Sequence, residues 1–211
     1  MINELIKLHE IKGVEIKRRL QEFKEVFNQN NERVLAELAF CLCTPQSKAT
    51  VCWNAIESLM KNNLLYIGTA EQIKPFLNAV RFSEKKSKYI VAARELFTEN
   101  GKLKIKEKIK LINDVFELRE WLVENVKGLG MKESSHFLRN IGFSHNLAIL
   151  DRHILKNLKE LKVIDEIPKS LTKKKYLEIE QKMKAFAKRI SIPLDNLDLL
   201  LWSKETGEIF K

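Results

Sequence analysis

One lysine in this sequence stands where an ammonium group is electrostatically unfavourable. Gly128 and Gly130 form a Gly-x-Gly link between two predicted helices, and Lys132 follows in the first turn of the second helix. The positive end of the helix dipole disfavours an exposed cation there by about 0.3–1 kcal/mol and favours the neutral amine. A neutral lysine amine is a nucleophile that can form a Schiff base with a sugar carbon. Lys132 is therefore the candidate catalytic nucleophile.

The Gly-x-Gly link also indicates a contact with phosphate. Glycine permits positive φ angles and a close approach of the backbone to a ligand, and a helix start carries N–H groups without intrahelical partners. Such groups, helped by the helix dipole, bind phosphate without reading a base sequence. Gly128 and Gly130 are therefore candidate DNA-binding residues. The alternative is an ordinary helical hairpin in which the glycines only make the turn.

An aspartate is the second candidate catalytic residue. Asp151 follows Lys132 by nineteen positions and precedes a helical run that begins at Arg152. Aspartate is a favoured N-cap residue, so a structural role alone explains this position. A carboxylate held at a helix start can also orient a nucleophile and stabilise the positive charge that develops on a deoxyribose ring as its base departs. The two roles are compatible.

The composition favours a polyanionic partner. The 211 residues include 38 Lys and Arg against 28 Asp and Glu, which gives a formal net charge of +10 at pH 7. Such a surplus favours nucleic acid, because neutralising phosphates releases condensed counterions. Nine of the basic residues fall within residues 84–110. A run of this kind is also typical of an ordinary solvated surface.

The cysteines and the hydropathy bear on cofactors and location. Cys41, Cys43 and Cys52 are an odd number in apolar surroundings, which supports neither a disulfide framework nor a four-cysteine zinc or iron–sulfur site. We expect no metal and no other cofactor. No stretch approaches the roughly 20 apolar residues that a bilayer span needs. We therefore expect an intracellular protein, of the cytoplasm or nucleoid, that acts as a monomer away from membranes.

Apolar residues recur at spacings of three and four almost throughout, which predicts an all-α fold. Only 7 Gly and 4 Pro occur, which argues against a turn-dense β-sandwich. Residues 102–110 alternate like a strand without an obvious partner, so we expect a turn or short helix there. No long linker interrupts residues 1–211, and we expect a single unit, either undivided or made of two helical lobes around a cleft. The hairpin element is expected at about residues 114–142.

Residues with capping side chains mark most of the expected helix starts. The expected starts are Asn31, Ser47, Thr69 with Gln72 as a capping box, Ser83, Asn113, Thr172 and, through its ring, Pro193. The helix that begins at Asn31 is expected to end at the Thr44-Pro45 step, and the helix that begins at Ser83 is expected to end at Gly101.

Gly128, Gly130 and Lys132, followed by Asp151, resemble the helix-hairpin-helix and Gly/Pro…Asp element of the DNA glycosylase superfamily that includes endonuclease III. More closely, the sequence resembles the archaeal and bacterial second-type 8-oxoguanine DNA glycosylase/lyases over nearly its whole length. The segments that carry this resemblance are KESSHFLRN at 132–140, AILDRHIL at 148–155 and IDEIPK at 164–169.

The resemblance implies a bifunctional base-excision enzyme that acts on double-stranded DNA containing 8-oxoguanine. By the family pattern, Lys132 attacks C1′ of a flipped-out nucleotide and displaces the base, and β-elimination from the resulting imine nicks the strand. Asp151 is then the carboxylate that assists the attack. Phe82 and Trp202 correspond to the aromatic pair that sandwiches the extruded base. The alternative for each aromatic residue is an ordinary place in the core.

Further contacts are implied near the chain end and in one turn. Lys211 corresponds to the terminal lysine that folds into the base pocket, the alternative being a frayed tail. Asp198 is a weaker base-binding candidate. The turn that holds Gln46 resembles the Ala-Gln-Thr turn of endonuclease III-like enzymes, so Gln46 is a candidate to fill the gap in the duplex. The loop at 142–146 is one residue longer than in some relatives.

Two other functions stay open from the residues alone. The same scaffold could excise oxidised pyrimidines or another damaged base, which the Gln46 turn favours. A non-catalytic hairpin protein that only grips DNA would also account for the basic charge and the Gly-x-Gly link.

Overall fold

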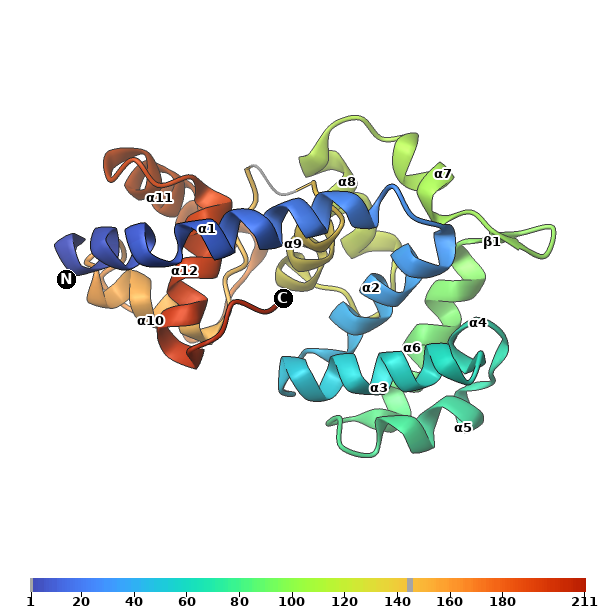
Figure 1. Ribbon diagram of the computed structural model, residues 1–211. Helices are drawn as coiled ribbons and strands as arrows, with labels where there is room; N and C mark the ends of the chain where they lie inside the picture. Colours follow the sequence, from blue (N-terminus) through green and yellow to red (C-terminus); the bar gives the residue numbers. More distant parts are fainter. Residues whose placement is uncertain (1, 144–145) are drawn as a thin grey trace. The chain divides into compact units, whose positions relative to one another are not determined.

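The computed structural model describes residues 2–143 and 146–211, and the chain divides into two compact units (Figure 1). The terminal unit comprises Met1–Glu25 and Leu138–Lys211, and the central unit comprises Val26–Phe137. Helices form nearly all of the regular structure in both units, so the predicted all-α fold is confirmed. The expectation for the loop at 142–146 falls partly on Ser144 and His145, which lie outside the described residues.

The core of the central unit is built around α2 (Asn31–Cys43), in which every residue from Val34 to Cys43 is buried. A helix that is apolar on most sides must be enclosed by its neighbours. Here these neighbours are α3 (Ala49–Lys61), α6 (Ser83–Leu96) and α7 (Ile105–Lys110). The other elements of this unit are α4 (Leu64–Ile67), α5 (Ala70–Ile73), the 3₁₀ helix η1 (Lys74–Leu77), α8 (Val115–Asn125) and most of α9 (Met131–Asn140).

The terminal unit is centred on α12 (Leu194–Thr206), which packs against α10 (Arg152–Glu160) and α11 (Lys173–Arg189). The side chains of α12 from Leu197 to Leu201 are all buried. The long helix α1 (Ile2–Val26) adds Leu5, Ile16 and Phe23 to the buried apolar residues. Burial of these side chains provides the main driving force for packing the helices.

Residues 102–110 contain both a strand and a short helix. β2 (Lys102–Leu103) pairs antiparallel with β1 (Thr98–Glu99), and α7 follows at Ile105. The strand partner lies immediately upstream, across a two-residue turn at Asn100 and Gly101 with φ angles of 50° and 71°. Asn-Gly is a strong signal for such a turn. The expectation of a short helix is confirmed by α7. The expectation that a strand here would have no partner is wrong, because β2 pairs with β1.

Several predicted helix starts are confirmed by the hydrogen bonds of their caps. Thr69 and Gln72 form the predicted capping box of α5, and Thr172 accepts a hydrogen bond from the Lys175 N–H at the start of α11. Pro193 precedes α12 as predicted. These caps depend only on local chemistry, because the side chain and the N–H group that it binds lie within three residues.

Two predicted caps are wrong by one residue. Asn30, not Asn31, caps α2 by accepting the Arg33 N–H, because the Asn31 side chain accepts the Lys106 N–H at 2.8 Å. Asp114, not Asn113, caps α8. Its carboxylate accepts two N–H groups at 2.8 and 2.9 Å, and its charge favours it beside the positive end of the helix.

Two further predicted boundaries are wrong for tertiary reasons. α3 begins at Ala49 without a side-chain cap, because the Ser47 hydroxyl instead accepts the Arg81 N–H at 3.0 Å. α6 begins at Ser83, as expected, but Phe82 occupies the N-cap position with a left-handed φ of 60° and gives no side-chain cap. This helix ends at Leu96 rather than at Gly101, since the chain turns into the hairpin of β1 and β2.

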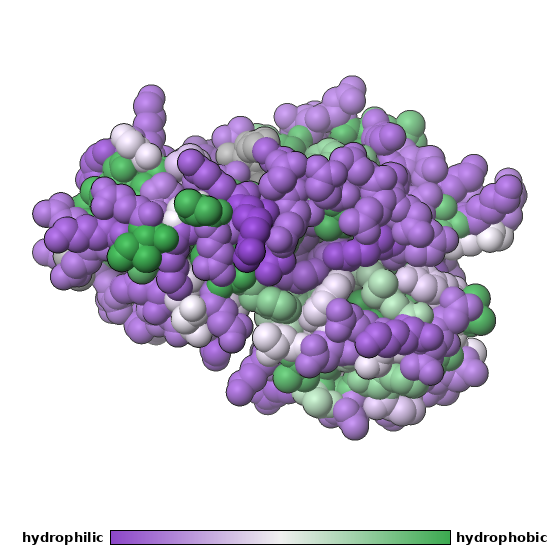
Figure 2. All heavy atoms as spheres, in the orientation of Figure 1, coloured by the Kyte–Doolittle hydropathy of each residue, from purple (hydrophilic) through white to green (hydrophobic). Residues whose placement is uncertain are grey.

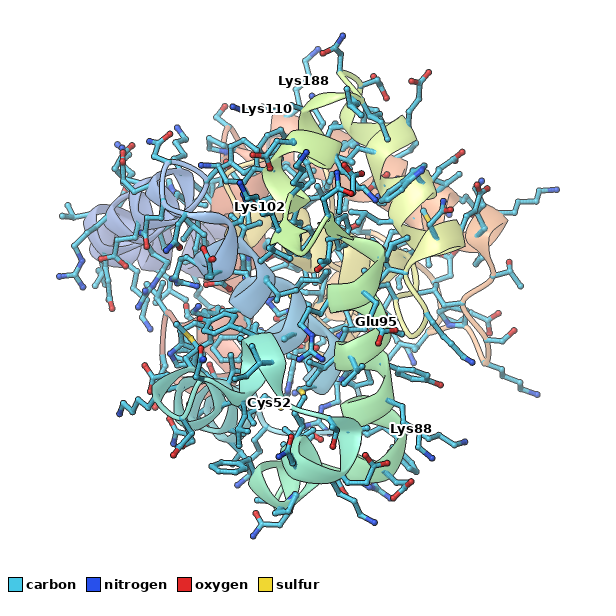
Figure 3. All side chains as sticks on the ribbon, turned by 90° about the vertical axis from the view of Figure 1, so that its right-hand side faces the viewer. Cys52, Lys88, Glu95, Lys102, Lys110 and Lys188 are labelled. Atoms are coloured by element: carbon cyan, nitrogen blue, oxygen red, sulfur yellow. The ribbon has the colours of Figure 1, made fainter. Side chains whose placement is uncertain are left out.

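Hydrophilic side chains cover most of the face shown in Figure 2, as expected for a chain with 31% charged residues. Lys88, Glu95, Lys102 and Lys110 are exposed, whereas Cys52 is buried between helices of the central unit (Figure 3). Within the described ranges, no helix has the length and apolar character needed to cross a bilayer.

Candidate active site

The predicted hairpin corresponds to α8 and α9, joined by residues 126–130. Gly128 has a φ of +99°, and a Cβ atom added there would lie 2.4 Å from Cδ2 of Tyr89. Both the left-handed conformation and the contact with α6 therefore require glycine. The buried Arg119 of α8 donates to Oγ of Ser135 on α9 at 3.1 Å and ties the two helices together.

Lys132 lies in the first turn of α9, as predicted, and it has a carboxylate neighbour that was not predicted. Its Nζ is 3.0 Å from Oε1 of Glu133, and the two side chains are 22% and 14% exposed. Oε2 of Glu133 accepts the Gly130 N–H at 3.3 Å. Glu133 thus stabilises the helix start and at the same time holds Nζ of Lys132 in an ion pair. The sequence signal for the contact between Glu133 and the Gly130 N–H is their spacing of three residues, which is typical of a capping box.

A second lysine, Lys86, is buried in the central unit near Lys132. Burial lowers the pKa of Lys86, and the positive charge of Lys132 adds to this effect. Cys52 is within electrostatic reach of both lysines, but burial still raises its pKa to about 11. Burial also raises the pKa of Cys43. All three cysteines are free and buried, and their neutral thiols are poor nucleophiles.

Asp151 caps α10, as the structural alternative predicts. Its Oδ1 atom accepts the N–H groups of His153 and Ile154, both at 2.8 Å. Among the described residues these are its side-chain hydrogen bonds, so Oδ2 is available to a bound group. The cap fixes the orientation of the carboxylate, which is compatible with the catalytic role predicted for it.

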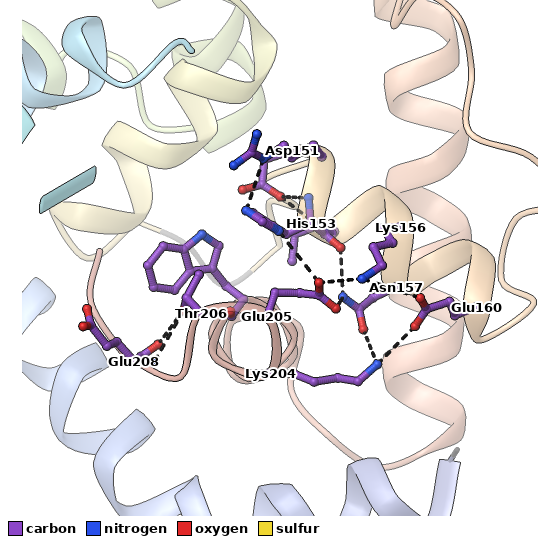
Figure 4. A network of polar contacts seen from close by, with 12 residues as sticks. Asp151, His153, Lys156, Asn157, Glu160, Lys204, Glu205, Thr206 and Glu208 are labelled. Atoms are coloured by element: carbon purple, nitrogen blue, oxygen red, sulfur yellow. Dashed lines mark hydrogen bonds and ion pairs between the residues drawn. The ribbon is translucent and has the colours of Figure 1, made fainter. Parts of the chain in front are cut away.

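The helix that Asp151 begins is anchored to α12 by a polar network (Figure 4). Glu205 accepts hydrogen bonds from Lys156 at 2.8 Å and from Asn157 at 3.1 Å. His153 has its Nδ1 4.0 Å from Glu205 and its Nε2 3.3 Å from Nε of Arg152. These contacts hold α10 in place and give His153 a structural role.

Asp198 is buried and has a specific partner. Its Oδ2 lies 2.6 Å from Nη1 of Arg139, and both side chains are about 5% exposed or less. Burial, together with the negative charges of Asp151 and Asp195, raises the pKa of Asp198 to about 7 against the opposing effect of Arg139. The structure therefore places Asp198 in an ion pair inside the terminal unit, within electrostatic reach of Asp151.

The candidates for contact with a base or with the duplex differ in exposure. Phe82 is 53% exposed, so its alternative as a core residue is wrong. Gln46 is exposed on the turn after α2 with a φ of 57°. Trp202 on α12 is partly buried. Lys211 is only 8% exposed, so the alternative of a frayed tail is wrong.

The candidate residues fall into two groups. The central unit contains Gln46, Phe82, Gly128, Gly130 and Lys132, and the terminal unit contains Asp151, Asp198, Trp202 and Lys211. Each group is ordered by hydrogen bonds and packing within its own unit.

An all-α fold with a glycine-linked hairpin that carries a lysine at the start of its second helix is that of the helix-hairpin-helix DNA glycosylases. A family model described as 8-oxoguanine DNA glycosylase matches residues 16–192. The 8-oxoguanine DNA glycosylase/AP lyase of Fusobacterium nucleatum is 51% identical over 210 residues, which cover 99% of this chain and 97% of that protein. The chain belongs to the 8-oxoguanine DNA glycosylase family.

Solved structures agree with this assignment. The crystal structure of the Methanocaldococcus jannaschii 8-oxoguanine glycosylase/lyase with a 15mer DNA containing 8-oxoguanine matches with a TM-score of 0.89 at 36% identity, and the match covers 100% of this chain and 99% of that one. The 8-oxoguanine DNA glycosylase of Thermotoga maritima matches with a TM-score of 0.86 at 33% identity, over 100% and 98% of the two chains.

Proposed function

We propose that this protein is a bifunctional DNA glycosylase that excises 8-oxoguanine from double-stranded DNA and then nicks the strand. The observation that carries the proposal is Lys132 at the start of α9, in a chain whose relatives of near-equal length are named 8-oxoguanine DNA glycosylase/AP lyase.

In the proposed reaction, the neutral Nζ of Lys132 attacks C1′ of the extruded nucleotide. The N-glycosidic bond breaks, and 8-oxoguanine leaves with the bonding electrons and takes up a proton. Ring opening gives an imine between Nζ and C1′. Loss of a proton from C2′ then breaks the bond between C3′ and its oxygen, which cleaves the strand on the 3′ side of the lesion, and water releases the lysine.

Asp151 is assigned the role of assisting the attack. A carboxylate fixed by two backbone N–H groups stabilises positive charge on the sugar without reorganising as that charge develops. Nζ of Lys132 lies 3.0 Å from Oε1 of Glu133, so it must leave this ion pair before it attacks.

Recognition of the base is assigned to Phe82, Trp202 and Lys211. Stacking of an extruded base on an aromatic ring is worth roughly 1–3 kcal/mol, and Phe82 already presents its ring to solvent. Lys211 is proposed to read the base edge, where 8-oxoguanine carries an N7–H donor and guanine only an acceptor. A binding site that accepts a hydrogen bond from N7–H of 8-oxoguanine rejects guanine, which has no donor at N7.

Gly128 and Gly130 are proposed to hold the phosphate backbone.

Two further properties belong to the proposal. We propose that the protein acts as a monomer, which size-exclusion chromatography with light scattering tests. We also propose that it works inside the cell, where its three free cysteines stay reduced.

Borohydride trapping tests the function. With a duplex containing one 8-oxoguanine, the wild-type protein should form a covalent complex, and Lys132→Gln should form none. Trapping without dependence on Lys132 would remove the assignment of the nucleophile. Equal activity on a thymine glycol duplex would favour the alternative of oxidised pyrimidines, and salt-sensitive binding without any strand cleavage would leave a DNA-binding protein only.

A further inference from the structure

The structure couples two exposed residues of the central unit through one buried lysine. We propose that Lys86 is a positioning residue that fixes Gln46 and Phe82 as one rigid element against the DNA duplex. This inference rests on the proposed function, which assigns Phe82 to the extruded base, and on the sequence-based prediction that Gln46 fills the gap in the duplex.

The ammonium group of Lys86 is fully used by the turn that carries Gln46. Lys86 is 4% exposed, and its Nζ donates to the carbonyl oxygens of Cys43 and Pro45, each at 2.7 Å, and to Oγ of Ser47 at 3.4 Å. An ammonium group has three N–H donors, so each has an acceptor here. Pro45 and Ser47 flank Gln46 directly, so the turn is held on both sides of the exposed side chain.

The same contacts extend to Phe82. Oγ of Ser47 accepts the backbone N–H of Arg81 at 3.0 Å, one residue before Phe82. The backbone N–H of Lys86 donates to the carbonyl oxygen of Phe82 at 3.0 Å. Lys86 and Ser47 therefore join the Gln46 turn to the start of α6, although these segments lie more than thirty residues apart in sequence.

Backbone geometry indicates why such a clamp is needed. Gln46 and Phe82 have φ angles of 57° and 60°, in the left-handed region that side chains other than glycine seldom adopt. Residues keep such conformations only where the surrounding structure imposes them. A side chain fixed beforehand loses less conformational entropy on entering the duplex or stacking on a base. The clamp thus prepares both residues for DNA.

The position also suits a buried cation. Cys43 is the last residue of α2, and the carbonyl groups at a helix C-terminus carry partial negative charge. A methionine of similar length fills the same space but donates no hydrogen bond. Lys86→Met therefore removes the clamp with little change in packed volume.

Arg94 offers a matched control. It also lies on α6, and it donates to the carbonyl oxygens of Leu65 and Gly68 at 3.2 and 2.9 Å. Burial lowers its pKa as well. Arg94→Met therefore removes a similar clamp from the same helix, but one that does not touch the Gln46 turn or Phe82.

The test compares excision of 8-oxoguanine from a duplex with cleavage at a preformed abasic site, which needs no stacking of a base. We expect Lys86→Met to lower excision by about tenfold or more relative to abasic-site cleavage, because small displacements of binding groups are costly. Arg94→Met should leave this ratio unchanged. Equal loss of both activities in Lys86→Met, as in a variant that is merely destabilised, would overturn the proposal.

Ser47→Ala is a second variant that tests the same proposal if Lys86→Met does not fold. It removes only the hydroxyl that joins the turn to Arg81, and it should lower the same ratio in the same direction. A duplex with 2-aminopurine beside the lesion reports insertion into the base stack by fluorescence, and both variants should show a weaker increase than wild type. If wild type fails to excise 8-oxoguanine, the proposed function fails, while this fluorescence still decides the positioning role.

Discussion

Glu133 is in direct contact with the proposed nucleophile. It pairs with Lys132 and accepts the Gly130 N–H, so it combines a structural and an electrostatic effect. The glycine spacing and the family resemblance predicted Lys132, but neither predicted its partner. The spacing from Gly130 explains a glutamate at this position as half of a capping box. The ion pair between its other oxygen, Oε1, and Nζ of Lys132 is visible only in the structure.

Replacing Glu133 by glutamine should make the amine more reactive. Glutamine keeps an oxygen for the Gly130 N–H but removes the negative charge that pairs with Nζ of Lys132, so the amine no longer has to leave an ion pair before it attacks. Ion pairs of this kind are worth roughly 0.2–1 kcal/mol, so imine formation in single turnovers at neutral pH should rise about 1.5- to 5-fold. A slower reaction with an unchanged melting temperature would show that the Glu133 carboxylate itself aids the attack.

Asp198 should give the stability a specific pH dependence. Its pKa is raised to about 7 from an unperturbed 3.8, so between these values the folded state binds a proton that the unfolded state does not. The free energy of unfolding should therefore fall as the pH rises from about 4 to about 7 and become constant above that range. Arg139 acts against this effect by favouring the carboxylate.

Chemical denaturation of wild type and of Asp198→Asn between pH 5 and pH 8 isolates this contribution. The difference between the two proteins should change with pH in that window, with wild type losing stability relative to the variant as the pH rises. A constant difference would show that Asp198 is ionised throughout and that the ion pair with Arg139 outweighs burial.

At the scale of elements, the hairpin depends on one glycine for two separate reasons. Gly128→Ala places a Cβ atom 2.4 Å from Tyr89 at a φ of +99°, whereas Gly101→Ala at a φ of +71° meets no atom within 4 Å. A left-handed alanine costs roughly 1–2 kcal/mol by itself. Gly101→Ala should therefore lose about that amount of stability, and Gly128→Ala should lose clearly more.

Thermal and chemical unfolding measure both losses. Tyr89→Ala in the Gly128→Ala background should recover the part that is due to the clash. Equal losses at Gly128 and Gly101 would mean that α6 moves away from the hairpin at little cost.

Elements governed by local chemistry were predictable, and those governed by distant contacts were not. Thr69 and Thr172 cap helices as their types predict. Asn31 was displaced from its predicted cap by a bond to Lys106, and Ser47 by its bond to Arg81. α6 begins at Ser83 as predicted, but the left-handed conformation of Phe82 at its N-cap position had no signal in the sequence.

At the scale of the molecule, the positive charge should control DNA affinity. The exposed lysines can contact phosphates, and such contacts make log affinity fall linearly with log salt concentration. Damaged and undamaged duplexes should give similar slopes, because phosphate contacts carry no sequence information. Fluorescence anisotropy at several salt concentrations measures both slopes, and affinity that does not depend on salt would contradict this account.

The basic run at 84–110 is not simply a DNA-facing surface. Lys86 is buried, Lys106 donates to the carbonyl oxygen of Gln29, and Lys108 donates to that of Leu96. Charge counts in the sequence could not distinguish these lysines from exposed ones such as Lys88, because the difference arises from tertiary contacts.

The boundaries between the two units had no signal in the sequence. The unit boundaries fall at residues 25 and 26 within α1 and at residues 137 and 138 within α9. A boundary inside a continuous helix needs no linker, so neither glycine, proline nor a change in composition marks it. The expected cleft between two lobes stays a prediction.

The most direct test of the central claim is to identify the atom that is trapped. After borohydride reduction with the 8-oxoguanine duplex, proteolysis and mass spectrometry should find the sugar adduct on the peptide that contains Lys132, attached at that residue. An adduct on Lys86 or on the N-terminal amine would contradict the assignment of Lys132 as the nucleophile.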